Sequence, residues 1–222
     1  MIKRPCLLIF GHGYTANAFV DYIRNIDWEI FGTTRNSQTA DLLIKKGVKP
    51  LMWSDGSKII SVLNRSDYIL HSIPPTEIGD PVYKRFSKAI ISRSTNLSWF
   101  GYLSTTSVYG NHDGKWVDEN VPVNPSSNRG LLRVKAENNW SSIKDLPLHI
   151  FRLAGIYGPN RSPLDKIRSG KAQLISKPGQ FFSRIHVEDI ARVLKASIEM
   201  PNHGSVYNVC DDLPAAPDEV LD

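Results

Sequence analysis

The chain has 222 residues, of which 41% are hydrophobic, and this supports one α/β domain with a small additional lobe. Its 27 basic and 22 acidic residues give a net charge of +5, and the basic residues form no long run, which argues against nucleic acid as a partner and favours small anionic ligands. Because the apolar runs are too short for a membrane span or a signal-peptide core, we expect a cytoplasmic protein with no membrane partner.

The first apolar run, at 6–10, is unbroken, as in a strand of a parallel sheet that is covered on both faces. Gly11-His-Gly-Tyr-Thr-Ala16 follows, and apolar residues then recur at helical spacing as far as Ile23. This order is typical of the Gly-x-Gly-x-x-Ala turn that holds a dinucleotide pyrophosphate at a helix N-terminus. A turn without a ligand is the alternative. We expect four residues of this turn to bind the cofactor: Gly11, Gly13, Tyr14 and Thr15.

The second strand is predicted at 28–33, and Thr33-Thr34-Arg35 stands at its end. An NAD site carries Asp or Glu at this place, which binds the ribose hydroxyls. Hydroxyls and a guanidinium suit a 2′-phosphate instead. An ordinary solvated arginine is the alternative for Arg35, but its position at the strand end favours a functional role. The sequence therefore favours NADP over NAD, with Thr34 and Arg35 as ligands.

A helix at 39–46, a strand at 49–53 and a helix near 58–64 are predicted next. Asp55, between that strand and that helix, could bind an adenine amino group or serve as a helix cap. A strand at 68–73 then stops at two prolines, and a helix with an apolar stripe follows from 82 to 93. At the carboxyl end of that strand we expect three more cofactor contacts: Ser72, Ile73 and Pro74.

The remaining elements are expected at 100–103 (strand), 131–143 (helix), 149–153 (strand), 187–198 (helix) and 206–209 (strand), with an irregular, functional or mobile segment at 111–130. Strands and helices alternate almost throughout. The chain is therefore predicted to be one doubly wound, Rossmann-type α/β domain with a parallel sheet. Residues 160–185 and the C-terminal end are expected to contribute a small substrate lobe, which could be incomplete because the chain stops where a helix begins.

Five segments resemble, in order, the NAD-dependent epimerase/dehydratase superfamily of extended or atypical short-chain dehydrogenases/reductases. They are the Gly11–Ala16 turn, LSTTSVYG at 103–110, RLAGIYGP at 152–159, RIHVEDIA at 184–191 and YNVCDD at 207–212. The Gly-x-Gly-x-x-Ala spacing is similar to the atypical branch, because the extended type usually has Gly-x-x-Gly-x-x-Gly.

The resemblance implies that Thr105 is the catalytic Ser/Thr, which would hold a substrate carbonyl or alcohol oxygen. It also implies that Lys135 is the lysine of the family's Tyr-x-x-x-Lys motif and binds the nicotinamide ribose. Leu131 then stands where the tyrosine should be. The turn after the strand at 149–153 resembles one whose backbone packs on the nicotinamide, which implies contacts from Gly155 and Ile156.

A leucine cannot transfer a proton, and general acid help is typically worth ~10²–10⁴ in rate. Another side chain could act instead, and the candidates near strand ends or beside the gap are Tyr102, Tyr109, Tyr157, Arg129 and Arg133. Alternatively, the substrate needs no protein acid. We therefore expect an NADP(H)-dependent oxidoreductase or epimerase/dehydratase-like enzyme that acts on a small carbonyl, alcohol or nucleotide-sugar-like substrate. A catalytically silent NADPH-binding sensor or regulatory protein is the alternative, and a homodimer is compatible with the sequence.

His186, Glu188 and Asp189 are too close in sequence to converge on one face of a helix, and no second cluster completes a site, so no metal is expected. The aspartate is instead predicted to cap a helix and the histidine to satisfy a buried backbone group. Cys6 and Cys210 both lie in apolar contexts and are expected to be buried, reduced thiols. Five basic residues either attract an acidic substrate or form a solvated face: Arg161, Lys166, Arg168, Lys171 and Lys177.

Overall fold

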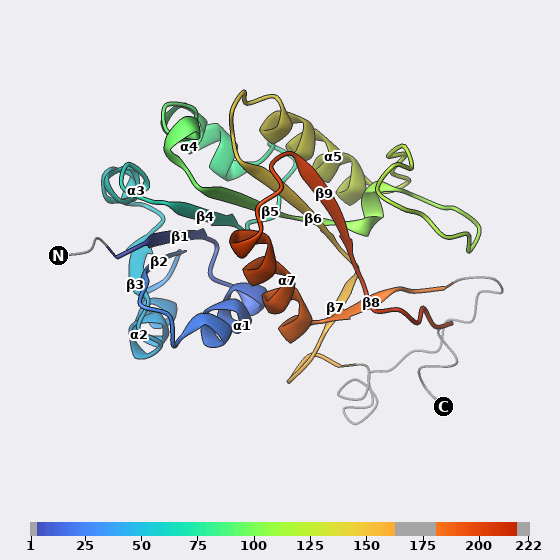
Figure 1. The fold of residues 1–222 in the computed structure, drawn as a ribbon, viewed down its shortest axis with the longest axis horizontal. Coiled ribbons are helices and arrows are strands. Elements are labelled where there is room, and N and C mark those ends of the chain that lie inside the picture. The colour runs from blue at the N-terminus through green and yellow to red at the C-terminus, as the bar shows by residue number, and fades with distance from the viewer. Residues whose placement is uncertain (1–3, 163–180, 217–222) are drawn as a thin grey trace.

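The computed structural model describes residues 4–162 and 181–216, which form a seven-stranded parallel sheet with helices on both faces (Figure 1). The strand order is β3-β2-β1-β4-β5-β6-β9, and every neighbouring pair is parallel. The predicted doubly wound, Rossmann-type class is therefore confirmed. The strands are β1 (Cys6–Phe10), β2 (Glu29–Thr34), β3 (Lys49–Met52), β4 (Tyr68–His71), β5 (Trp99–Thr105), β6 (Leu148–Leu153) and β9 (Ser205–Val209).

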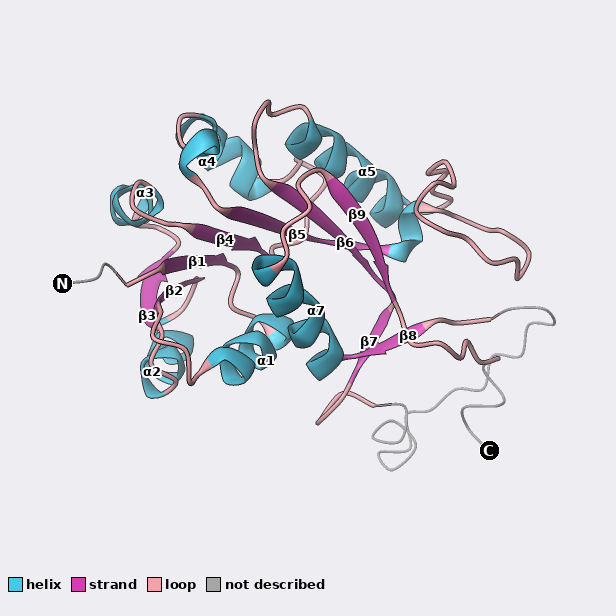
Figure 2. Ribbon diagram, viewed as in Figure 1, coloured by secondary structure: helices cyan, strands magenta, loops and turns pink. Residues whose placement is uncertain are grey.

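The helices form two layers, one on each face of the sheet (Figure 2). One layer contains α1 (Tyr14–Ile23), α2 (Ser37–Lys45) and α7 (Val187–Glu199). The other contains α3 (Gly56–Leu63), α4 (Pro81–Ile91) and α5 (Asn128–Ser141). Two short 3₁₀ turns, η1 (Ser94–Asn96) and η2 (Thr106–Val108), flank β5. No helix among the described residues has both the length and the apolar character needed to cross a membrane.

The central strand β1 explains why the chain forms this architecture. All five of its residues are fully buried. Successive side chains of a strand point to opposite faces, so Leu8 and Phe10 pack with α3, α4 and α5, whereas Leu7 and Ile9 pack with α1 and α7. An unbroken apolar sequence is what a strand covered on both faces requires.

The predicted helix at 131–143 begins too late. In the structure α5 starts at Asn128, where the side chain of Ser127 accepts a hydrogen bond from the Gly130 N–H at 3.1 Å and caps the helix. The buried face of α5 contains Arg133, Glu137 and Trp140. The other predicted boundaries fall within two residues of the observed ones.

A second, two-stranded parallel sheet was not predicted from the sequence. It pairs β7 (Gly155–Tyr157) with β8 (Arg184–His186) and lies beyond the carboxyl ends of β6 and β9 (Figure 1). The small lobe predicted at 160–185 and the C-terminal end lies largely outside the described residues, as do four of the five basic residues expected near it.

Two predictions about individual side chains are wrong. His186, and not Asp189, is the N-cap of α7, because its ring accepts from the Glu188 N–H, while Asp189 forms an ion pair with Arg192 at 2.7 Å. Cys6 is buried as expected, but Cys210 is exposed; neither forms a disulfide with the other.

Candidate functional site

The turn after β1 requires glycine at its first position. Gly11 has a φ of +82°, and its N–H donates to Thr33 Oγ1 at 2.8 Å. A Cβ at this position would lie 2.5 Å from the Cγ1 of Ile73. Both the backbone conformation and the close approach of the loop after β4 therefore exclude larger residues. The structure thus brings two of the predicted cofactor residues, Gly11 and Ile73, into contact.

The second glycine leaves the start of α1 accessible. Gly13 is the N-cap of α1, which has no side-chain cap, and a Cβ at Gly13 would meet no atom within 4 Å. Ala16 is fully buried against the sheet, as expected for the close-packed third position of the motif. The open N-terminus offers backbone N–H groups and the positive end of the helix dipole. These residues therefore fit the pyrophosphate of a dinucleotide.

The next two predicted ligands lie at the same turn but differ in accessibility. Thr15 is buried, with 6% of its surface exposed, so its side chain packs in the protein. The Tyr14 hydroxyl donates to the carbonyl of Pro159 at 3.0 Å, and the Arg161 guanidinium lies over the Tyr14 ring. Tyr14 thereby connects the turn to the segment that follows β7.

At the end of β2 the two threonine hydroxyls are used within the protein. Thr33 holds Gly11, and the Thr34 hydroxyl donates to the carbonyl of Asn36 at 3.3 Å. Both threonines are buried, whereas Arg35 is exposed and forms no ion pair with any described residue. Arg35 is therefore the group at this strand end that remains available for a negatively charged ligand.

Asp55 caps a helix, which is one of the two roles considered for it. Its Oδ1 accepts from the Lys58 N–H at 3.1 Å, and its Oδ2 forms an ion pair with Lys58 Nζ at 2.9 Å. The side-chain hydrogen bond from Lys58 lowers the pKa of Asp55. The observed contacts account for this aspartate without a ligand.

Thr105 lies at the carboxyl end of β5, where a substrate of an α/β protein would be bound. It is half-buried, it pairs with Leu153 of β6, and its Oγ1 accepts from the Ser107 N–H at 3.2 Å. Gly155 and Ile156 lie at the start of β7, one residue beyond the end of β6 at Leu153. The structure therefore brings three predicted site residues to one end of the β5–β6 pair.

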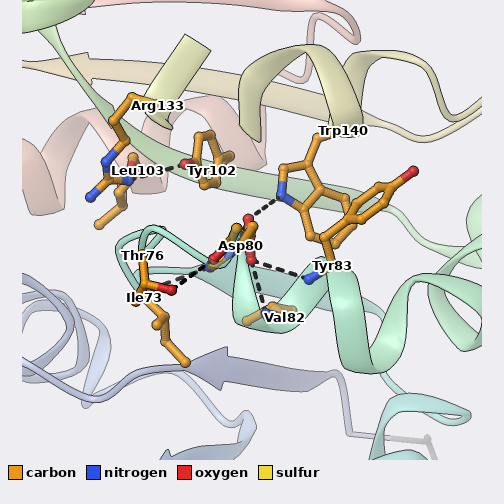
Figure 3. A network of polar contacts seen from close by, with 11 residues as sticks. Ile73, Thr76, Asp80, Val82, Tyr83, Tyr102, Leu103, Arg133 and Trp140 are labelled. Atoms are coloured by element: carbon orange, nitrogen blue, oxygen red, sulfur yellow. Dashed lines mark hydrogen bonds and ion pairs between the residues drawn. The ribbon is translucent and has the colours of Figure 1, made fainter. Parts of the chain in front are cut away.

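The choice of Lys135 is not supported by the geometry. Lys135 is exposed, whereas Arg133 is buried and donates to the carbonyl of Leu103 and, at 3.2 Å, to the hydroxyl of Tyr102 (Figure 3). Residues two positions apart are separated by ~200° around a helix, so Lys135 cannot share the face of Arg133. Leu131 is also on the outer side, with 48% of its surface exposed.

Arg129 and Arg133 are four residues apart on α5, so they lie on the same side of the helix. Both line a pocket of about 530 Å³ between the loop after β4 and the first turns of α5. Of the predicted site residues, this pocket includes Pro74. Its lining residues are Pro74, Pro75, Thr76, Glu77, Asn128, Arg129, Leu132 and Arg133.

The three tyrosines considered as substitute acids do not line this pocket. Tyr102 is completely buried, and this burial raises its pKa. The Tyr109 hydroxyl accepts from Arg152 and donates to Asn208, each at 2.7 Å. Tyr157 lies in β7, and burial together with a hydrogen bond to Asp211 raises its pKa.

A buried polar network that the sequence reasoning missed fixes the loop beside the pocket (Figure 3). His71 Nε2 and Trp140 Nε1 each lie 2.8 Å from Asp80 Oδ2, and Asp80 Oδ1 accepts from the N–H groups of Val82 and Tyr83. Burial acts to raise the pKa of Asp80, but the His71 ring and the other N–H donors outweigh it, and the pKa is lowered. The sequence offers one signal for this network: Asp80 followed by Pro81 is typical of an N-cap and the first residue of a helix.

The described residues contain no group of three or more His, Cys, Asp or Glu side chains that could hold a metal ion.

Comparisons with known proteins show which family the chain resembles. Residues 7–210 match the NAD dependent epimerase/dehydratase family. Protein YeeZ from Escherichia coli (strain K12) is 33% identical over 220 residues, which cover 94% of this chain and 78% of YeeZ.

Two solved structures show how closely the fold is shared. A functionally unknown conserved protein from Silicibacter pomeroyi DSS is 46% identical with a TM-score of 0.89, over 98% of this chain and 76% of that protein. The dTDP-glucose 4,6-dehydratase from Bacillus anthracis str. Ames, solved in complex with NAD, is 18% identical with a TM-score of 0.80, over 98% of this chain and 79% of the dehydratase.

Proposed function

The chain belongs to the NAD dependent epimerase/dehydratase family, and we propose that it binds NADP(H) and transfers hydride to or from a small carbonyl or alcohol substrate. The observation that carries this proposal is the open N-terminus of α1 at Gly13, where a side chain is missing and nothing fills the space. A nucleotide-sugar-like substrate is a narrower form of the same proposal. Support for it comes from relatives of this fold such as the dTDP-glucose dehydratase.

The preference for NADP over NAD rests on Arg35. Its exposed guanidinium lies at the end of β2, next to two threonines whose hydroxyls are occupied within the protein. A guanidinium there would pair with a 2′-phosphate, and the strand end carries no carboxylate to bind ribose hydroxyls. We place the other cofactor contacts at Ser72, Ile73, Gly155 and Ile156.

When bound, the nicotinamide supplies or accepts the hydride. The Thr105 hydroxyl then donates a hydrogen bond to the reacting substrate oxygen and so stabilises negative charge that develops on it. Neither arginine of the pocket can donate a proton, because a guanidinium stays protonated in proteins. The proton therefore comes from water or from the substrate, and we expect a slow reductase or one whose substrate needs little acid help.

The lack of a tyrosine in the pocket favours the second candidate, a catalytically silent NADPH-binding sensor or regulatory protein. Arg129 stands one helical turn before Arg133, where the Tyr-x-x-x-Lys spacing would put the tyrosine. In this alternative, the turn at Gly11–Ala16 binds the cofactor and no chemistry follows.

A titration of the chain with NADPH and NADH, followed by fluorescence, tests the proposal. We expect tighter binding of NADPH, loss of this advantage in Arg35→Ser and loss of both ligands in Gly13→Asp. A screen of carbonyl substrates then separates the two candidates, because oxidation of NADPH occurs only in the enzyme. Failure to bind either dinucleotide would refute both candidates, and an advantage for NADH would refute the role of Arg35.

We also propose that the protein is cytoplasmic and forms homodimers. The two free thiols, Cys6 and Cys210, support a reducing compartment. Cell fractionation and light scattering of the purified chain test these two points.

A further inference from the structure

Arg133 is a buried cation that lacks a carboxylate partner. Only 7% of its surface is exposed, and its two partners, the Leu103 carbonyl and the Tyr102 hydroxyl, are neutral. Arg152, which is equally buried, has the carboxylate of Glu137 at 2.8 Å. No ion pair joins Arg133 to any described residue. Since an uncompensated buried charge is costly, the surroundings of Arg133 favour an anion.

The pocket beside Arg133 adds more positive potential. Arg129 lines the same pocket from one helical turn earlier, and Asn128, the first residue of α5, lines it as well. The positive end of the α5 dipole therefore lies at this pocket. Glu77 contributes one carboxylate to the lining and forms no ion pair with either arginine. Two guanidiniums against one carboxylate leave the lining with an excess of positive charge.

We infer that this pocket binds an anionic group of the substrate, a carboxylate or a phosphate. A guanidinium presents its N–H donors in a planar fork that matches both groups. The volume of about 530 Å³ is in the range of small-molecule sites. This inference rests on the proposed function only in assigning the anion to the substrate. It explains why arginine occupies position 129: the residue anchors the substrate there and does not protonate it.

The anchored group would lie near the atoms that react. Arg133 bonds to the carbonyl of Leu103, and Thr105 follows two residues later at the end of the same strand. The pocket contains no residue of the Gly11–Ala16 turn, so it is separate from the place proposed for the dinucleotide pyrophosphate. The substrate class is therefore a carbonyl or alcohol compound that also carries an acidic group.

Calorimetric titration of the full chain with sodium phosphate and, in parallel, sodium malonate tests this inference without any dinucleotide. The ionic strength is kept constant with sodium chloride, because exposed charges attract all anions weakly. We expect saturable binding of at least one probe, and the tighter probe identifies the group as phosphate or carboxylate. Arg129→Gln and Arg133→Gln should each weaken binding about tenfold, because each removes a charge-assisted hydrogen bond. Glu77→Gln should strengthen it.

Lys144→Gln is the matched control, because it removes one exposed positive charge just after α5 and should leave the affinity unchanged. Arg129 is exposed, so its variant remains informative if Arg133→Gln does not fold. Gly13→Asp should still bind the probe. The inference is overturned if no saturable binding occurs, if Lys144→Gln weakens binding as much as Arg129→Gln, or if Gly13→Asp abolishes it. Because NADPH is absent, failure here is distinct from failure to bind the cofactor.

Discussion

Asp80 should be one of the most important polar residues for stability. Its side chain is fully buried and receives four hydrogen bonds. Oδ1 accepts from the N–H groups of Val82 and Tyr83, and thereby caps α4. Oδ2 lies 2.8 Å from both His71 Nε2 and Trp140 Nε1. Replacing Asp80 by alanine leaves these buried donors without an acceptor, and we expect a loss of about 3–5 kcal/mol in the free energy of unfolding.

Asp80→Asn is the sharper variant because its size is unchanged. The amide oxygen can still cap α4, but the amide NH₂ then faces the N–H groups of both His71 and Trp140. His71 cannot relieve this conflict by changing tautomer, because its Nδ1 already accepts from the Ile73 N–H at 3.3 Å. Two buried donors lose their acceptor, so we expect the free energy of unfolding to fall by about 2–4 kcal/mol.

Urea unfolding at pH 7, followed by tryptophan fluorescence, measures both variants. Asp41→Asn is the control, because Asp41 is exposed on α2 and its replacement should change stability by less than about 0.5 kcal/mol. The pKa of Asp80 is lowered in the folded state, so its contribution is present above about pH 4 and is lost as the pH falls through the folded value. The difference in the free energy of unfolding between wild type and Asp80→Asn should then become smaller as the pH falls. A cost below about 1 kcal/mol for Asp80→Asn at pH 7 would refute the reasoning.

Three further predictions concern the turn at Gly11, two buried histidines and the helix cap at Asp55. Gly11→Ala should lower the free energy of unfolding by about 2 kcal/mol and abolish NADPH binding, because of the positive φ and the contact with Ile73. Urea unfolding and fluorescence titration with NADPH check this, and normal NADPH binding would contradict it. Burial lowers the pKa of His12 and of His149 to about 4. Between about pH 6.5 and 4 the unfolded chain therefore binds more protons than the folded chain. As the pH falls through that window, the free energy of unfolding should decrease by up to about 3 kcal/mol for each histidine. Stability that stays constant from pH 7 to 4 would refute this. Asp55→Ala should lower Tm slightly, Asp55→Asn should retain the cap, and neither should change NADPH affinity; a weaker affinity in both would instead support the adenine contact.

Most of the fold was predictable because its strands and most of its helices follow apolar periodicity. The run at Cys6–Phe10 and the stripe of α7 are examples, since apolar side chains form nearly all of their buried surface. The short pair of β7 and β8 was missed because strands of three residues carry too little pattern, and the pairing joins segments distant in sequence.

The register of the site helix was missed for a different reason. The buried face of α5 contains Arg133 and Glu137, and a search for apolar spacing passes over charged residues that are buried with partners. The resemblance to the Tyr-x-x-x-Lys motif pointed to positions 131 and 135, which lie on the exposed side of the helix. Ser127, a good N-cap residue, was the signal that could have placed the start correctly.

The charge on that buried face decides which group is left for a ligand. Glu137 has two carboxylate oxygens, and both are engaged, by Ser104 and by the guanidinium of Arg152. These contacts hold α5 against β5 and β6. They also leave no carboxylate for Arg133, which lies on the same side of the helix one turn earlier. Had Glu137 paired with Arg133, the pocket would contain a compensated ion pair and a weak attraction for anions. The ion pair that stabilises the domain is therefore also the reason why the pocket keeps a positive charge for the anion that we propose it binds.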